Sequence, residues 1–125
     1  MPATILIVDD SSTVRAMVRT ALKADRHRVL EAAHGGTALT MLEEATADLV
    51  ITDINMPEID GLTLVRRVRQ RAEHRFTPIL VLTTEASDDM KQRGREAGAT
   101  GWIVKPFRAD QLRDVVQRVL KTRAA

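Results

Sequence analysis

The chain has 125 residues, of which 44% are hydrophobic and only 2% aromatic, and its 19 Lys and Arg against 17 Asp and Glu leave a net charge of +2. This length suits a single domain, which we place at residues 1–125, with a core built from aliphatic side chains. The small charge excess does not favour a nucleic-acid-binding protein, and the absence of cysteine excludes disulfides and thiolate metal sites. No apolar run is long enough for a signal peptide or a membrane span, so we expect a cytoplasmic protein with no membrane attachment.

Five short apolar runs predict five β-strands. They are Ile5–Val8, Arg28–Glu31, Leu49–Ile51, Pro78–Leu82 and Gly101–Val104. Three of the runs are almost wholly apolar and rich in β-branched residues, as in strands that are buried on both faces of a sheet. The second run is more polar, which favours an edge strand.

The segments between and after these runs show the apolar spacing of amphipathic helices. The stripes lie within residues 14–22, 38–45, 62–68, 87–97 and 112–120. The fourth stripe is thin, because it consists only of Met90, Gly94 and Ala97. Five alternating strands and helices predict an α/β fold with a doubly wound parallel sheet.

Polar residues follow four of the predicted strands. They are Asp9 and Asp10, Asp53 and Asn55, Thr83 and Thr84, and Lys105, which precedes Pro106. In a doubly wound sheet these strand ends lie at one edge, where ligands bind. Three carboxylates so close together repel one another, and a hard divalent cation such as Mg²⁺ relieves the repulsion. With the ammonium of Lys105, the cation would neutralise a phosphoryl group that a carboxylate accepts as nucleophile.

Each of these residues alone has a simpler interpretation. Asp9 and Asp10 precede Ser11 and can start a helix, and an aspartate after a strand is commonly a turn residue. A shared binding site is favoured over turn and cap residues only when the residues are taken together, because they follow four different strands at the same edge of the sheet.

Four segments resemble the response regulator receiver domain of two-component signalling, in the stand-alone form known as the CheY type. They are Asp9-Asp10, Asp53 to Gly61, Thr83-Thr84-Glu85 and Lys105-Pro106-Phe107. Their order and spacing match the family over essentially the whole chain. The resemblance implies a flavodoxin-like three-layer (βα)5 sandwich with strand order 2-1-3-4-5.

The resemblance also implies a role for each site residue. Asp53 would be the phosphorylated residue, and Mg²⁺ would bind to Asp10, to Asp53 and to the backbone carbonyl of Asn55, with Asp9 acting through water. Lys105 would contact the phosphoryl group and Asp53. Thr83 would move its hydroxyl towards the phosphoryl group, with Thr84 beside it in the phosphate-contacting loop, and the peptide bond before Pro106 would be cis.

Two further positions concern the switch and its lifetime. Trp102 stands where the family commonly has Tyr or Phe that changes rotamer on phosphorylation, and its larger ring and N–H distinguish it from those residues. Asn55 and Glu85 occupy the positions that the family associates with the rate of phosphate loss, and both match the chemotaxis type. The implied partners are a sensor histidine kinase and a downstream protein such as a flagellar motor switch, for a monomer that acts through its fourth helix, fifth strand and fifth helix.

Three alternatives remain. A phosphorelay shuttle or docking receiver of another pathway would share the whole pattern. A haloacid-dehalogenase-like phosphatase would need a D-x-D motif after the first strand, where this chain has adjacent aspartates. A flavodoxin-like binder of flavin or nucleotide would need a glycine- and hydroxyl-rich phosphate loop.

Two groups of residues outside the motifs are expected at the surface. The three histidines, His27, His34 and His74, have no metal-ligand spacing. The arginines of residues 66–75 are interpreted as a solvated helix face.

Overall fold

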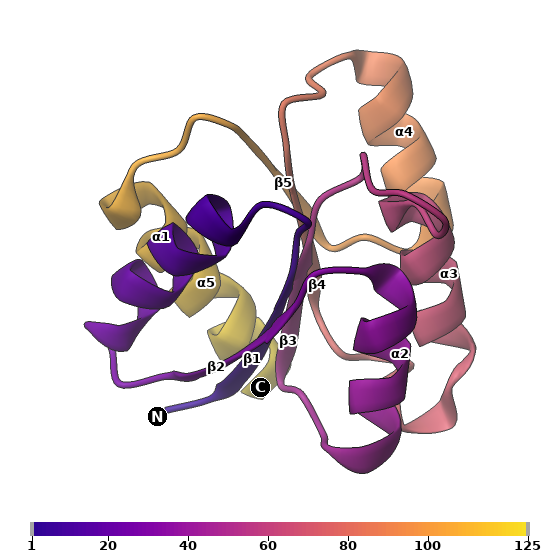
Figure 1. Ribbon diagram of the computed structural model, residues 1–125. Helices are drawn as coiled ribbons and strands as arrows, with labels where there is room; N and C mark the ends of the chain where they lie inside the picture. Colours follow the sequence, from indigo (N-terminus) through magenta and orange to yellow (C-terminus); the bar gives the residue numbers. More distant parts are fainter. Residues whose placement is uncertain (1, 125) are drawn as a thin grey trace.

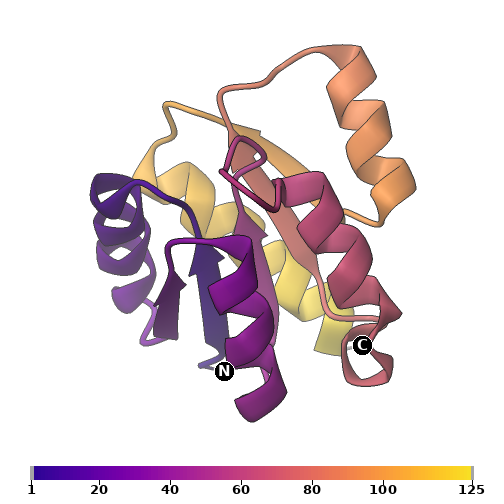
Figure 2. The same cartoon turned by 45° about the vertical axis from the view of Figure 1, so that its right-hand side comes forward.

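The computed structural model describes residues 2–124, with side chains described up to Lys121, and shows a five-stranded parallel sheet between two layers of helices (Figure 1, Figure 2). The strands are β1 (Thr4–Val8), β2 (Arg28–Ala32), β3 (Leu49–Thr52), β4 (Ile79–Thr83) and β5 (Gly101–Val104). Their order in the sheet is β2-β1-β3-β4-β5, and all neighbouring pairs are parallel. The predicted fold and strand order are confirmed, and the predicted strands agree with the observed ones to within one residue at each end.

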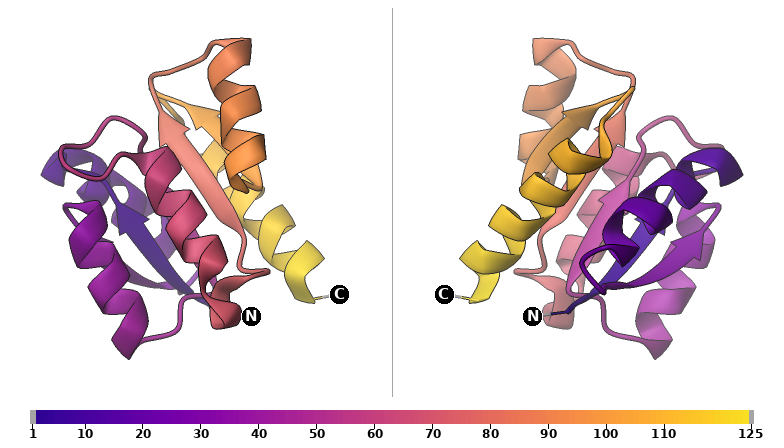
Figure 3. Two further views of the ribbon diagram at one scale, coloured as in Figure 1. Left: turned by 90° about the vertical axis from the view of Figure 1, so that its right-hand side faces the viewer. Right: turned by 90° about the vertical axis from the view of Figure 1, so that its left-hand side faces the viewer.

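The helices divide between the two faces of the sheet (Figure 3). They are α1 (Ser12–Lys23), α2 (Gly35–Glu44), α3 (Gly61–Gln70), α4 (Asp88–Ala97) and α5 (Ala109–Ala124), with a short 3-10 helix η1 (Ala72–His74) after α3. Helices α1 and α5 cover one face, and α2, α3 and α4 cover the other.

Alternating strand residues supply two separate cores. In β1, Leu6 and Val8 pack with α2 and α3, whereas Ile5 and Ile7 pack with α1 and α5. This alternation is the two-residue period of a strand, and it explains why the central strands are apolar at almost every position.

Helix α4 is held less firmly than its neighbours in the same layer. Of its ten residues only Gly94 and Ala97 are buried, while Met90 is half-buried against the core. Its N-cap is Ser87, whose side chain accepts a hydrogen bond from the N–H of Met90 at 3.2 Å. The thin stripe expected from the sequence is therefore also thin in the structure.

The expectation of three surface histidines is wrong for two of them. His34 is exposed, but His27 and His74 are buried. The Nδ1 atom of His27 accepts a hydrogen bond from the N–H of Ala3 at 3.0 Å, and Nδ1 of His74 lies 3.1 Å from Oγ1 of Thr77. Both histidines bond segments that lie just outside the strands, Ala3 before β1 and Thr77 before β4, and no periodic pattern in the sequence indicates such contacts.

The solvated interpretation of the arginine stretch is wrong for Arg69 and only partly right for Arg71, which is half-buried and pairs with Glu43 at 3.6 Å. Arg69 is half-buried and donates hydrogen bonds to the carbonyl oxygens of Gly98 at 3.0 Å, of His74 at 3.0 Å and of Thr77. It thereby joins α3 to the C-cap residue of α4 and to the segment that enters β4. Arg66 and Arg67 are exposed, as expected.

Within residues 2–124, no helix combines the length and the apolar character that crossing a bilayer requires.

Candidate functional site

The backbone ladder of the sheet brings the polar strand ends together. Residues Val8 and Thr52 are paired across β1 and β3, so the two aspartates that follow them start from adjacent positions. The ladder continues one residue further, because the N–H of Asp53 donates to the carbonyl of Val8 at 3.0 Å, and the N–H of Lys105 donates to the carbonyl of Thr83 at 2.8 Å. The site residues are thus fixed by the sheet itself.

Three carboxylates converge at this edge. One oxygen from each of Asp9, Asp10 and Asp53 lies within 4.8 Å of the others. Asp9 is fully buried and Asp53 nearly so, whereas Asp10 is exposed. The cluster is therefore closed towards the core and open to solvent on the side of Asp10.

Lys105 compensates part of this negative charge. Its Nζ donates to Oδ2 of Asp9 at 2.8 Å and to Oδ2 of Asp53 at 3.1 Å, with 15% of the lysine side chain exposed. Burial by itself would lower the pKa of Lys105, but the hydrogen bonds and negative charges of the two aspartates outweigh it, so the pKa is raised. The ammonium stays charged, and the three carboxylates with it leave a formal charge of two negative units.

This donor set fits a magnesium ion. Oxygen ligands from one or two carboxylates, with room for water on the open side, are what Mg²⁺ prefers, and its charge equals the uncompensated charge of the cluster.

The carboxylate of Asp53 is oriented from both sides. Its Oδ1 accepts from the N–H of Ile54 at 2.6 Å and lies 3.4 Å from the N of Asn55, while Oδ2 takes the bond from Lys105. The start of α3 packs directly behind it: a Cβ at Gly61 would lie 2.0 Å from the carbonyl oxygen of Asp53. Only glycine allows this approach. This explains why Gly61 ends the segment from Asp53 to Gly61 that resembles the family.

The remaining residues expected at the site lie around this centre. Asn55 is exposed in the loop after β3, Thr84 is exposed after β4, and Thr83 is buried at the end of β4 with its Oγ1 3.4 Å from the N of Glu85. The peptide bond before Pro106 is cis, as expected.

Trp102 is half-buried on β5 and is tied to the loop after β4. Its Nε1 donates to the carbonyl oxygen of Glu85 at 2.8 Å. Its ring also lies against α4 at Gly94, where a Cβ would come within 2.5 Å of Cζ3. Glu85, expected to act through its position near the phosphate, therefore contacts Trp102 through its backbone as well.

Sequence reasoning missed Arg15. Its Nη1 donates to the carbonyl oxygen of Asp9 at 2.7 Å, next to the carboxylate cluster. A basic residue in the second turn of a helix carries no signal for such a contact, because arginine is ordinary on any exposed helix face.

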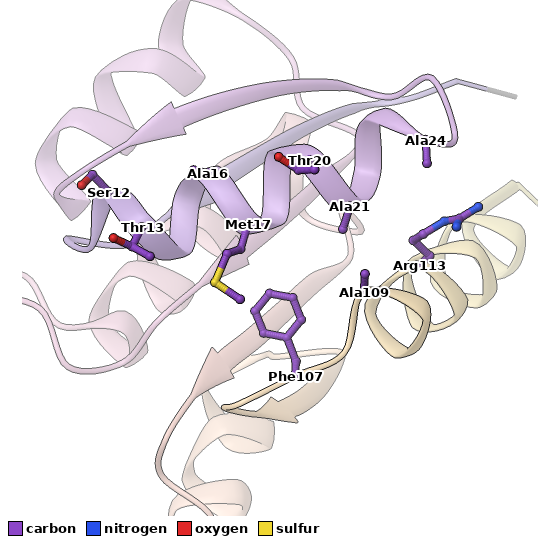
Figure 4. A pocket seen from close by; sticks show the side chains of 10 residues that line it. All are labelled: Ser12, Thr13, Ala16, Met17, Thr20, Ala21, Ala24, Phe107, Ala109 and Arg113. Carbon is purple, nitrogen blue, oxygen red and sulfur yellow. The ribbon is translucent and has the colours of Figure 1, made fainter.

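A surface groove lies between α1 and the N-terminal part of α5, with Phe107 of the preceding loop in its wall (Figure 4). Its apolar part is formed by Met17, whose side chain points towards the ring of Phe107, and by Ala109. Ser12, two residues after Asp10, lies at one end.

Comparison with known proteins agrees with this geometry. Residues 5–117 match the family model of the response regulator receiver domain. The chain is 38% identical over 118 residues to the chemotaxis protein CheY-3 of Vibrio cholerae, covering 94% of this chain and 91% of that protein. The solved structure of CheY4 of Vibrio cholerae superposes with a TM-score of 0.91 at 44% identity, covering 95% of this chain and 99% of that one.

A second similar structure contains a metal. The receiver domain of the sensor histidine kinase PA1611 of Pseudomonas aeruginosa, solved with a magnesium ion coordinated in its active-site cleft, has a TM-score of 0.88 at 26% identity, and the match covers 97% of this chain and 99% of that one. The family match over most of the chain and the relatives above 30% identity agree with the carboxylate cluster, and the chain therefore belongs to the response regulator receiver domain family.

Proposed function

We propose that the protein is a single-domain response regulator of chemotaxis, which receives a phosphoryl group on Asp53 from a histidine kinase and passes the signal on by protein contact. The observation that carries the proposal is the arrangement of Asp53, within 4.8 Å of two other carboxylates and 3.1 Å from the ammonium of Lys105. The similarity to chemotaxis proteins over 94% of the chain supports the pathway.

These positions support a direct, in-line transfer. A carboxylate oxygen of Asp53 attacks the phosphorus of a phosphohistidine, the new P–O bond forms as the P–N bond breaks, and the imidazole of the kinase leaves with the electron pair. Lys105 lies where it can meet the negative charge of the equatorial oxygens, which is the main demand of phosphoryl transfer. Because the protein itself keeps the group, it is a regulatory phosphoacceptor, and catalysis is limited to its own phosphorylation and dephosphorylation.

The proposed function includes Mg²⁺ as the cation bound at the carboxylate cluster. Asp10, Asp53 and the carbonyl of Asn55 would hold it, with Asp9 acting through water, and it would neutralise phosphoryl oxygens as a Lewis acid. The full hydrogen bonding of Asp9 supports an indirect role, since its Oδ1 accepts from Ser11 at 2.9 Å and its Oδ2 from Lys105 at 2.8 Å.

The switch would run from Asp53 to α4. Movement of Thr83 towards the phosphoryl group would pull on the following loop, where its Oγ1 lies 3.4 Å from the N of Glu85, and Glu85 in turn holds Trp102. The partner would read the surface of α4, β5 and α5, by a shift between two conformations. Because α4 buries only two small residues, we expect it to be the least protected helix in hydrogen exchange, and protection equal to that of α1 would contradict this switch.

The signal would be short-lived. Asn55 and Glu85 both match the chemotaxis type at the positions that the family associates with phosphate loss. Direct measurement of a slowly decaying phosphoprotein would remove this part of the proposal.

Trp102 allows a direct test, because it is the only tryptophan. Its fluorescence is followed while Mg²⁺ and then beryllofluoride or acetyl phosphate are added, and the phosphoprotein is identified by intact mass. Asp53→Asn should abolish the phosphoryl adduct and the beryllofluoride response. The control is Asp60→Asn, in the same loop, where an amide oxygen still caps α3 by accepting from the N–H of Thr63. No Mg²⁺ binding and no acyl phosphate in the wild type would refute the proposal.

A receiver that acts as a phosphorelay shuttle would pass these tests too. The similarity to a receiver domain of a sensor histidine kinase keeps this second role in view. The two roles differ in what the phosphoprotein does next: a shuttle transfers the group to a second histidine protein, whereas a chemotaxis regulator loses it to water.

A further inference from the structure

We propose that Arg15 is a positioning residue for the metal site, and that it sets Mg²⁺ affinity by fixing the peptide that joins Asp9 to Asp10. This inference rests on the proposed function, since it concerns the cation that the receiver would use. Arg15 itself contacts neither the cation nor the phosphoryl group. It acts through the backbone of the residue beside the ligand.

The contact with the backbone is short and sheltered. Nη1 of Arg15 donates to the carbonyl oxygen of Asp9 at 2.7 Å, and only 18% of the arginine side chain is exposed. The helix holds the arginine in place, because the N–H of Arg15 donates to the carbonyl of Ser11 at 3.1 Å. A hydrogen bond from a charged donor is stronger than one between neutral groups.

The other side of the guanidinium is anchored to the sheet. Nε of Arg15 donates to Oε1 of Glu31 at 3.2 Å, and Glu31 also binds Arg19 through Oε2. Glu31 lies on β2 and pairs with Ile7 on β1, two residues before Asp9. The arginine is thus held between a strand and the loop that carries the ligands.

With this contact every polar group of Asp9 is engaged. Its N–H donates to the carbonyl of Ala32 at 3.1 Å, its carbonyl accepts from Arg15, Oδ1 accepts from the N–H of Ser11 at 2.9 Å, and Oδ2 accepts from Lys105 at 2.8 Å. Asp9 is therefore fixed in all directions, and so is the peptide plane that follows it.

Asp10 is the opposite case. Its side chain is exposed, and among the described residues it accepts no hydrogen bond. The only thing that aims its carboxylate at the cluster is the backbone on which it stands. Release of the Asp9 carbonyl would let that peptide rotate, and Asp10 would spend less time where a cation needs it.

Charge and position make opposite predictions for Arg15. A positive charge beside a cation site weakens cation binding, so a purely electrostatic role predicts that loss of Arg15 tightens Mg²⁺ binding. A positioning role predicts weaker binding, because residues that orient metal ligands typically contribute at least about tenfold to metal affinity. The sign of the change separates the two.

The test is Mg²⁺ titration of the full chain by calorimetry, without kinase or phosphodonor. Arg15→Met should raise the dissociation constant about tenfold, and Arg15→Lys, which can still donate to the Asp9 carbonyl, should restore at least half of the loss in binding free energy. Arg19→Met is the matched control, since it removes a cation from the same Glu31 but makes no bond to Asp9. It should leave the affinity unchanged within about twofold.

A second readout needs no metal. Loosening of the turn should speed hydrogen exchange of the Ser11 amide in Mg²⁺-free Arg15→Met protein, and not in Arg19→Met. If Arg15→Met does not fold, Arg15→Leu, which also has no hydrogen-bond donor in its side chain, takes its place with the same expectations.

The outcomes separate this inference from the proposed function. Wild-type protein that fails to bind Mg²⁺ refutes the proposed function. Wild-type protein that binds Mg²⁺, with equal or tighter binding in Arg15→Met, overturns only the role of Arg15.

Discussion

Gly94 in α4 offers a sharp test of how Trp102 is held. A helix normally gains about 1 kcal/mol when an interior glycine is replaced by alanine. In this helix the added Cβ would lie 2.5 Å from Cζ3 and 3.1 Å from Cε3 of Trp102, where carbon atoms normally stay at least about 3.5 Å apart. The ring would have to move by about 1 Å, which is the difference between these distances.

The expected balance is unfavourable. Overpacking of this kind costs about 1–3 kcal/mol. Displacement of the ring also strains the 2.8 Å bond from Nε1 to the Glu85 carbonyl, a bond that contributes about 1 kcal/mol. After the gain in helix propensity, Gly94→Ala should lower the free energy of unfolding by roughly 1–3 kcal/mol.

The change in the free energy of unfolding is measured by urea titration with circular dichroism as the signal, which does not depend on tryptophan fluorescence. The control is Gly36→Ala in α2, where an added Cβ meets no atom within 4 Å, and where we expect a gain of about 0.5–1 kcal/mol. Combining Gly94→Ala with Trp102→Ala should change the sign, so that alanine at position 94 becomes stabilising. A stabilising effect of Gly94→Ala in the presence of Trp102 would refute the reasoning.

Three further substitutions test other parts of the structure. Lys105→Met leaves the buried carboxylates of Asp9 and Asp53 without their cation, so urea unfolding should show a loss of roughly 3 kcal/mol that Mg²⁺ partly restores, and unchanged stability would argue against the ion pairs. Burial lowers the pKa of His27, so its contribution to stability is present above the unfolded value of about 6.5 and is lost as pH falls through the folded value. Between about pH 7 and pH 5, thermal unfolding of wild type should therefore lose more stability than His27→Asn, by at most about 1.4 kcal/mol per pH unit, and parallel curves would exclude His27 as the titrating group. Arg69→Met removes charged donors from three carbonyls and should cost about 2–3 kcal/mol, with faster amide exchange in the last turn of α4, whereas exposed Arg67→Met should change stability by less than about 0.5 kcal/mol.

The predictable parts of the fold are those in which the type of each residue indicates whether its position is buried or exposed. The run Ile5–Val8 is apolar at every position because β1 is buried on both faces, and the carboxylates that follow it lie at the ligand-binding edge of any such sheet. Asp53 and Lys105 could be placed together for the same reason, although 52 residues separate them.

The parts that could not be predicted depend on where a long or polar side chain ends. Arg69 is an ordinary helix residue in the sequence, and its contact with Gly98 spans 29 residues. His27 bonds the N–H of Ala3 across 24 residues. Gly94 gives the opposite lesson: in the sequence it only weakens a helix, whereas in the structure it makes room for a ring that comes from another element.

The contact between Arg69 and Gly98 also determines how α4 can move. It fixes the C-terminal end of a rod of ten residues, which is about 15 Å long, and leaves the end beside Glu85 on a loop. A rod fastened at one end moves as a lever. A tilt of about 10° at Gly98 would carry the first turn of α4 through about 2.5 Å while the last turn hardly moves. A partner that binds the first turn of α4 would detect the whole displacement, and a partner that binds the last turn would detect almost none.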